Sequence, residues 1–203
     1  GRYFYINLDS QHPKFNYFDH TGDYLENSFH IAKIDIKSQG ATLLCKGYPR
    51  VYVSEPYKYA SFNLVNFTPS DGGFYVNFEA DSAIYRCDMD FHALEAFGRA
   101  GKGMDSDYLP VRSYEDADKY IKNRQEKGSY GKIAVAGDYI FRSYTRGAGS
   151  SVDGLQIYND GVLVGDVDVP KGFRVAGKIG DRFFSEIFSD HDSGQLSCFA
   201  FSL

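Results

Sequence analysis

The sequence predicts an all-β fold built mainly from antiparallel meanders, in one domain spanning residues 1–203. Tyr and Phe are frequent, with 17 of each, and Gly reaches 21 while Trp is absent. Aromatic residues combined with frequent Gly favour strands and turns over helices. Short apolar runs separated by tight polar turns recur along the chain, which is the pattern of strands joined by hairpins. A chain of this length buries most of its apolar surface without disulfides.

The stretch from Gly72 to Tyr108 shows the pattern most clearly. A Gly pair opens it, polar turns separate its apolar runs, and a Gly-rich segment follows the last run. Three short strands joined by tight turns form an antiparallel meander. The strands expected here span residues 74–78, 83–87 and 92–97.

The chain before this stretch predicts further strands around polar turns. Phe15–Phe18 and Tyr24–Ile31 flank a turn from Asp19 to Gly22, with Gly at its last position. The aromatic tract Tyr48–Tyr59 contains two prolines, which suit edge or loop backbone rather than a central strand. The remaining strands expected here span residues 2–8, 33–37, 41–45 and 61–67, and a loop is expected over 68–71.

One helix is expected, over residues 113–127. Ser113 fits the N-cap position, acidic residues occupy the first turn, and Gly128 can end the helix. Helical spacing places four residues on one face: Ala117, Tyr120, Ile121 and Arg124. Beyond the helix, strands are expected over 132–136, 139–145, 155–158, 162–169, 174–179, 183–188 and 196–203.

Three strand–turn–strand segments align around an Asp or Asn that opens the turn. These residues are Asp19, Asp88 and Asn159, at intervals of 88 − 19 = 69 and 159 − 88 = 71 residues. The side chain of Asp or Asn in this position can bond the backbone two residues on and hold the turn. A regular period of this kind indicates a repeat architecture.

The turn motifs resemble the six-bladed β-propellers of the NHL and TolB-like type, above all exported propeller proteins common in gut Bacteroidetes. The motifs that carry the resemblance are Phe97-Gly98-Arg-Ala-Gly101-Lys-Gly103, Phe18-Asp19-His-Thr-Gly22 and Gly180-Asp-Arg-Phe-Phe184. The resemblance implies radially arranged blades and export to the periplasm or cell surface.

The length of the chain departs from this family. A propeller blade takes ~40–50 residues, so the strands suffice for about four to five blades. We therefore expect a partial propeller or a fragment of a larger one. A β-sandwich or an open barrel remains the alternative fold.

Composition narrows the classes of partner. The net charge is −5, and no run of Lys and Arg resembles a nucleic-acid footprint. No stretch is apolar for ~18 residues, so no membrane span is expected. No signal peptide precedes the strand that begins behind Gly1, which is the pattern of a processed chain.

No cofactor or metal is expected. The cysteines Cys45, Cys87 and Cys198 are odd in number and include no CxxC pair. Cys87 and Cys198 fall in apolar strand patterns and are expected as buried free thiols, with one disulfide plus a free thiol as the alternative. The histidines have no zinc-site spacing. Asp190–Gly194 hints at calcium but fits a hairpin turn better, because Gly and Glu miss their positions in a calcium loop.

No catalytic residue can be nominated. G-x-S-x-G is absent, and no carboxylate pair stands out among the many acids. Gly98–Gly103 invites a phosphate-loop interpretation, but Lys102 is followed by Gly and no helix comes next. A Gly-rich turn between blades fits this segment better.

The expected function is a non-enzymatic binding module for a glycan or a protein partner at the cell envelope. The candidate loops are the tyrosine tract, Gly98–Tyr108 and Arg146–Ser151, because rigid sheets position loops for binding. Within the tract, tyrosines make rigid, amphipathic platforms. The nominated ligand-binding residues are Arg50, Tyr52, Tyr57 and Tyr59. The alternatives are rings that fill gaps between sheets, a carbohydrate-active hydrolase, or a structural scaffold of an envelope complex.

Overall fold

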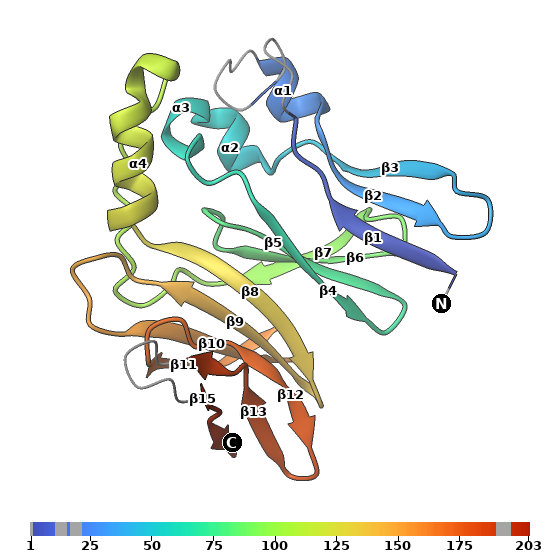
Figure 1. Cartoon of the computed structure of the whole chain (residues 1–203), viewed down its shortest axis with the longest axis vertical. Helices are drawn as coiled ribbons and strands as arrows, with labels where there is room; N and C mark the ends of the chain where they lie inside the picture. Colours follow the sequence, from blue (N-terminus) through green and yellow to red (C-terminus); the bar gives the residue numbers. More distant parts are fainter. Residues whose placement is uncertain (1, 11–15, 17–21, 190–195) are drawn as a thin grey trace.

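Antiparallel pairing between strands that follow one another in sequence builds the protein (Figure 1). The computed structural model describes residues 2–10, 16, 22–189 and 196–203. Sheet 1 contains β1 (Tyr3–Asn7), β2 (Phe29–Asp35) and β3 (Ala41–Lys46). Sheet 2 contains β4 (Val65–Ser70), β5 (Gly73–Phe78), β6 (Ala83–Cys87) and β7 (Ala93–Gly98).

The C-terminal half repeats this organisation. Sheet 3 contains β8 (Ser129–Ala136), β9 (Tyr139–Thr145), β10 (Asp153–Asn159) and β11 (Val162–Val169). Sheet 4 contains β12 (Val175–Ile179), β13 (Arg182–Ser185) and β16 (Ala200–Phe201). A separate two-stranded ladder pairs β14 (Phe188–Ser189) with β15 (Leu196–Ser197). The predicted all-β fold of antiparallel meanders is confirmed.

The first strands of successive sheets adjoin one another. The Asn7 side-chain amide of β1 donates to the Val65 carbonyl oxygen of β4 over 2.9 Å. Strand β4 lies against β8, and β8 lies against β12. This row of sheets is compatible with a partial propeller and with a sandwich-like fold, and the described strands form no closed barrel.

The turn chemistry follows the sequence. The Asp88 carboxylate accepts a hydrogen bond from the Asp90 backbone N–H at 2.9 Å, the local bond expected of that turn. At the β10–β11 hairpin, Asp160 and Gly161 both have positive φ, 48° and 74°, as a tight hairpin turn requires. The predicted turn from Asp19 to Gly22 lies almost wholly outside the described residues, as does most of the predicted strand Phe15–Phe18.

The predicted helix is confirmed, although its buried face is not the expected one. A 3-10 turn, η1 (Tyr114–Asp116), leads into α4 (Ala117–Glu126), and the Ser113 side chain accepts from the Glu115 N–H over 3.2 Å. Ile121 is 49% exposed, whereas Asn123 is fully buried. The helical spacing of the apolar residues predicted the wrong buried face, because polar Asn123 anchors this helix.

Two segments for which no helix was predicted are helical. Residues 24–27 belong to α1 (Gly22–Asn27), which buries Tyr24 and Leu25 in the core. The tyrosine tract forms α2 (Arg50–Ser54) and α3 (Pro56–Tyr59). A proline can occupy the first turn of a helix because its missing N–H is not needed there, and Pro56 begins α3 in this way.

Strand boundaries also differ from the prediction. Residues 29–35 form the single strand β2, although the sequence suggested a break within it. Strand β4 starts at Val65 and includes most of the segment 68–71 that was expected to be a loop. Figure 1 shows the helices gathered at one end of the sheets. Among the described residues, no helix is long and apolar enough to cross a membrane.

Three apolar cores hold the sheets together. The largest joins sheets 1 and 2 to the short helices and is rich in aromatic rings, such as Tyr48, Phe74, Phe78 and Phe91. A second joins sheet 3 to sheet 4 around Phe141 and Phe183. A smaller one joins sheets 2 and 3 through Ile84, Ile133, Ile140 and Tyr158.

Candidate functional site

The tyrosine tract contributes largely to the core. Tyr52 is only 2% exposed, and its hydroxyl donates to the Phe62 carbonyl at 2.7 Å and accepts from the Ala80 N–H at 2.9 Å. Half-buried Tyr59 packs against Tyr52 at 5.4 Å between ring centroids. Tyr52 therefore presents no ring face to a ligand.

The other two nominated residues lie nearer the surface. Tyr57 is half-buried, with the Arg112 guanidinium 4.9 Å from its ring centroid. Arg50 is exposed at the start of α2. The four nominated residues thus do not form one exposed aromatic surface.

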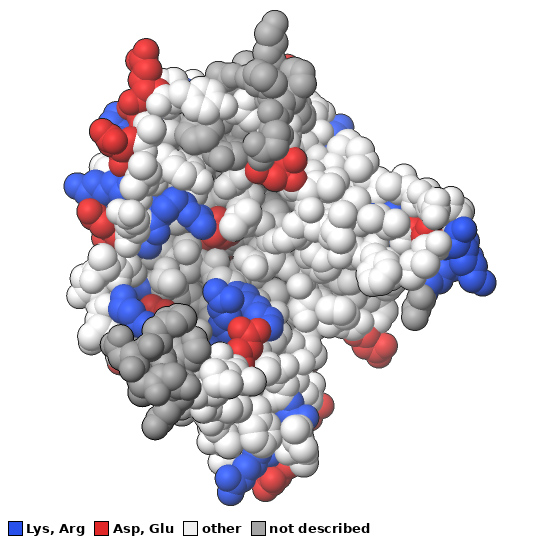
Figure 2. Space-filling model, viewed as in Figure 1, with Lys and Arg blue, Asp and Glu red and all other residues white. Residues whose placement is uncertain are grey.

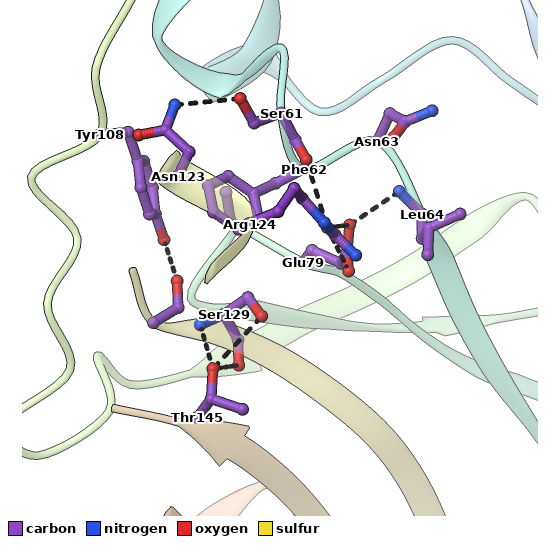
Figure 3. Close-up of polar contacts among 12 residues, drawn as sticks. Ser61, Phe62, Asn63, Leu64, Glu79, Tyr108, Asn123, Arg124, Ser129 and Thr145 are labelled. Atoms are coloured by element: carbon purple, nitrogen blue, oxygen red, sulfur yellow. Dashed lines mark hydrogen bonds and ion pairs between the residues drawn. The ribbon is translucent and has the colours of Figure 1, made fainter. Parts of the chain in front are cut away.

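A partly buried ion pair fastens α4 to the loops that flank β4 and β5 (Figure 3). Arg124 donates from Nη1 to both carboxylate oxygens of Glu79, at 2.9 and 2.8 Å, and to the Ser61 carbonyl at 3.2 Å. Glu79 also accepts from the Leu64 N–H at 3.1 Å. Burial raises the pKa of Glu79, and the adjacent Arg124 opposes that shift. Since its oxygens are already engaged, Glu79 is better suited to anchoring the helix than to transferring protons.

Asn123 completes this anchor. Its side-chain amide donates to the Ser61 hydroxyl at 3.0 Å and to the Leu109 carbonyl at 2.8 Å, and its oxygen accepts from the Leu109 N–H at 2.8 Å. A fully buried amide with its groups satisfied fixes one position for the helix. These contacts join the segments before β4 and before α4.

The Gly-rich segment 98–103 is fastened to sheet 3. The backbone N–H groups of Arg99, Gly101 and Lys102 donate to the Tyr158 hydroxyl, the Tyr130 hydroxyl and the Asp166 carboxylate. A phosphate loop needs free N–H groups directed at the ligand. These three are already engaged, which fits the predicted turn between sheets.

Arg142 of β9 lies at the centre of this fastening and is fully buried. Its Nε and Nη2 donate to the Gln156 side-chain oxygen at 3.0 and 2.6 Å, and Nη2 also reaches the Arg99 carbonyl at 2.9 Å. The guanidinium carbon lies 4.0 Å from the Tyr130 ring centroid. Burial lowers the pKa of Arg142, because desolvation disfavours its charge. The contacts it makes bind the connection between sheets 2 and 3.

The third candidate loop, Arg146–Ser151, is partly fixed by its neighbours. The Arg146 guanidinium contacts the Asp168 carboxylate at 2.6 Å, and the Ala148 N–H donates to the Glu126 carbonyl at 2.8 Å. The loop therefore lies against the end of α4.

A cavity of about 430 Å³ lies between sheet 1 and one side of sheet 2, formed by β5, β6 and the start of β7. Pockets for small ligands span ~300–1,000 Å³ and are mostly apolar. This cavity fits that description, because its walls include Leu43 and Leu44 of β3 and Val76, Phe78 and Phe91 of sheet 2 and its turn. We call it the β3 cavity.

The rim of the β3 cavity carries charge. Lys46, Asp90 and His92 contribute to its lining. Asp90 pairs with Lys33 at 3.3 Å, and His92 pairs with Asp88 at 3.0 Å. Lys46 makes no ion pair within the described residues. An apolar interior with one uncommitted cation at the rim suits an amphipathic ligand.

Two thiols line the same cavity. Burial raises the pKa of Cys45 to about 12 and that of Cys87 to about 11, so both thiols are protonated near neutral pH. A protonated thiol is a poor nucleophile and a poor metal ligand. All three cysteines are free, as was expected of Cys87 and Cys198, but Cys198 is exposed where the strand pattern predicted burial.

Other groups considered from sequence add no chemistry to the cavity. Among the described residues, no three His, Cys, Asp or Glu side chains are grouped to hold a metal ion. The calcium-like segment Asp190–Gly194 lies outside the described residues. The buried Asp81 carboxylate accepts hydrogen bonds from the Tyr85 hydroxyl at 2.7 Å and the Ala83 N–H at 2.9 Å.

The structural comparison supports a mostly-β fold. A solved structure of a member of the DUF4221 family from Bacteroides vulgatus matches with a TM-score of 0.66 and 11% sequence identity. The match covers 91% of this chain and 55% of that one, so this chain spans about half the length of that protein. No family model and no curated protein matches the sequence. A six-bladed NHL or TolB-like propeller is not confirmed.

Sequence reasoning missed the β3 cavity because its walls come from distant segments. The run Leu43-Leu44-Cys45 and the turn before Ala93 each read as an ordinary strand end and hairpin. One signal in the sequence pointed to an incomplete first sheet: the segment between Cys45 and Ser61 has two prolines and no alternation of apolar and polar residues. It therefore supplies no fourth strand for the first sheet.

Proposed function

We propose that the chain is a non-enzymatic binding module that takes a protein partner at the β3 cavity, at the cell envelope. The observation that carries the proposal is an accessible, apolar cavity of ligand size between two sheets. Apolar side chains of a partner suit such walls, because burying apolar surface is the main favourable contribution to association.

The chemistry of the cavity supports binding over catalysis. General acid–base or nucleophilic catalysis needs a group poised to exchange a proton or to attack. The thiols here are held protonated by burial, and the nearest acid, Asp90, is paired with Lys33. The buried carboxylate of Glu79 is already paired with the Arg124 guanidinium.

The position of the tyrosines favours a protein over a glycan. Sugar recognition by aromatic residues needs exposed ring faces, and Tyr52 has none. Tyr57 and Arg50 retain some accessibility, so they stay the residues to test for a glycan. Placement at the envelope rests on the resemblance to exported propeller proteins. On the face in Figure 2, acidic and basic side chains lie in small mixed groups, and no single sign of charge dominates.

The experiment titrates the apolar fluorescent dye anilinonaphthalene sulfonate into the wild type and the Ala93→Arg variant. Ala93 lines the cavity at an exposed position, so arginine there should fill the cavity without unfolding the protein. We expect saturable binding in the wild type and a loss of about tenfold or more in affinity in the variant, or about 1.4 kcal/mol. Ala117→Arg, on the exposed side of α4, is the matched control and should bind like the wild type.

Two results would contradict the proposal. Dye binding that ignores Ala93→Arg would place the binding site elsewhere. Release of reducing sugar from a panel of polysaccharides would show an enzyme. A polysaccharide that raises the melting temperature without turnover, and loses this effect in Tyr57→Ala, would favour the glycan alternative.

A further inference from the structure

Sheet 1 has three strands, one fewer than sheets 2 and 3. Sheets 2 and 3 each have four strands, and their fourth strands, β7 and β11, adjoin each other. Sheet 1 stops at β3, after which the chain turns into α2 at Arg50. Figure 1 shows β3 at the outer edge of its sheet, and no described strand pairs with that edge.

The β3 cavity adjoins the place where a fourth strand of sheet 1 would lie. Its walls come from β3, the start of β2 and the segment after β3 on one side, and from β5, β6, the following turn and the start of β7 on the other. The far side of β7 is covered, since Phe97 packs edge-on against Tyr158 of sheet 3 at 5.5 Å. By contrast, Leu43 of β3 is 51% exposed and Leu94 of β7 is 60% exposed.

We propose that an extended segment of a partner polypeptide adds to the free edge of β3 as the fourth strand of sheet 1. This inference rests on the proposed function and names the partner's chemistry. A strand is the occupant that the molecule itself indicates, because strands fill the matching places in sheets 2 and 3. A free edge also presents unpaired N–H and C=O groups that only a partner with the same groups satisfies along its length.

The charge at the rim sets the orientation and composition of the segment. In sheets 2 and 3, the fourth strand runs antiparallel to the third. An antiparallel partner of β3 begins opposite Lys46, the last residue of that strand. The segment should therefore carry an acidic residue near its N-terminal end and apolar residues at the alternate positions that face the cavity.

The test uses synthetic peptides of about ten residues, the length of a long strand. The peptides carry Glu at the N-terminal end, Thr at alternate positions, and a pool of Val, Leu, Ile and Phe between them. Fluorescence polarisation measures their binding to the full chain. Two further sets carry N-methyl groups on every second backbone nitrogen. One set loses the hydrogen-bond donors along one edge of the peptide strand, and the other set loses those along the opposite edge.

Strand addition predicts an asymmetric result. Methylation of the edge that faces β3 should lower affinity by about tenfold or more, and methylation of the opposite edge should leave it nearly unchanged. Lys46→Glu should weaken the acidic peptides and spare a version with Lys at the N-terminal end. Ala93→Arg should weaken every peptide, and Ala117→Arg should weaken none.

The alternatives give different results. Peptides that tolerate methylation on both edges, with dye binding still lost in Ala93→Arg, would overturn strand addition and leave the proposed function standing. Failure of both the peptide pool and the dye would overturn both proposals. A concentration-dependent dimer that excludes the peptides would show that a second copy of this chain takes the edge, and would also overturn the inference.

Discussion

The boundary between sheets 1 and 2 and the boundary between sheets 2 and 3 are built from different chemistry. Between sheets 2 and 3, side chains such as Arg142, Gln156 and Tyr158 bind backbone groups of the connection. Between sheets 1 and 2, aromatic rings pack around one another, with Tyr5 of β1 edge-on to Phe74 of β5 at 4.8 Å and His30 of β2 edge-on to Phe78 of β5 at 5.9 Å.

The difference accounts for the apolar walls of the β3 cavity, which lies at the first boundary. Hydrogen bonds at fixed geometry specify one arrangement and penalise any group left unpaired. Apolar packing is non-directional and tolerates an unfilled place more easily. Strand β7 of sheet 2 is covered by sheet 3 on one side. The side of sheet 2 that faces β3 borders the β3 cavity instead.

The largest expected effect comes from the polar boundary. Arg142→Met removes the buried cation together with its hydrogen bonds to the Gln156 oxygen and the Arg99 carbonyl. We expect a loss of about 3–5 kcal/mol in the free energy of unfolding, measured by urea denaturation, because each hydrogen bond to a charged group contributes about 1.5–3 kcal/mol. Arg86→Met is the control, because its exposed pair with Glu95 should contribute less than about 1 kcal/mol. Equal effects of the two substitutions would mean that Arg142 does not fasten this boundary.

The aromatic boundary should respond to pH through His30. Its ring lies edge-on to Tyr48 at 4.2 Å, and burial lowers its pKa to about 4. The unfolded chain therefore takes up the proton first as the pH falls. Stability should be fully present above pH 6.5, the ordinary pKa of the residue, and should fall between 6.5 and about 4 by about 3 kcal/mol.

Glu79 changes the stability in the opposite direction as the pH falls, because its raised pKa makes the folded state favour its protonated form. A variant of the histidine separates the two contributions. His30→Gln should remove most of the loss of stability between pH 6.5 and 4, measured by urea denaturation at several pH values. An unchanged pH dependence in this variant would show that His30 is not the titrating group.

A smaller effect is expected from Tyr52, which the sequence suggested as a ligand contact. Tyr52→Phe keeps the ring and removes the hydroxyl that serves the Phe62 carbonyl and the Ala80 N–H. The buried partners left unpaired should cost about 1–3 kcal/mol in the free energy of unfolding. Tyr75→Phe, whose hydroxyl makes no hydrogen bond within the described residues, should change it by less than about 0.5 kcal/mol. If Tyr52→Phe is as stable as the wild type, the residue is free for a ligand and the tract returns as the candidate site.

The fold was largely predictable because strands and hairpins are marked locally. Turn pairs such as Gly137-Asp138 and Asp160-Gly161 lie at the hairpins that they predict. The tract Tyr48–Tyr59 was misassigned because buried aromatic residues serve helices and strands alike, and a proline fits both an edge strand and the first turn of a helix. The β3 cavity was out of reach because it forms only when residues 43–49 pack against 85–93.

Hydrogen exchange of the β3 backbone amides, Ala41–Lys46, tests the open edge most directly. In the free protein, the amides that point away from β2 should exchange much faster than those of β10, an interior strand paired on both sides. An acidic strand-forming peptide should slow the exchange of these β3 amides and leave β10 unchanged. If the outward β3 amides of the free protein are already protected as strongly as β10, the edge is not open and the account of sheet 1 is wrong.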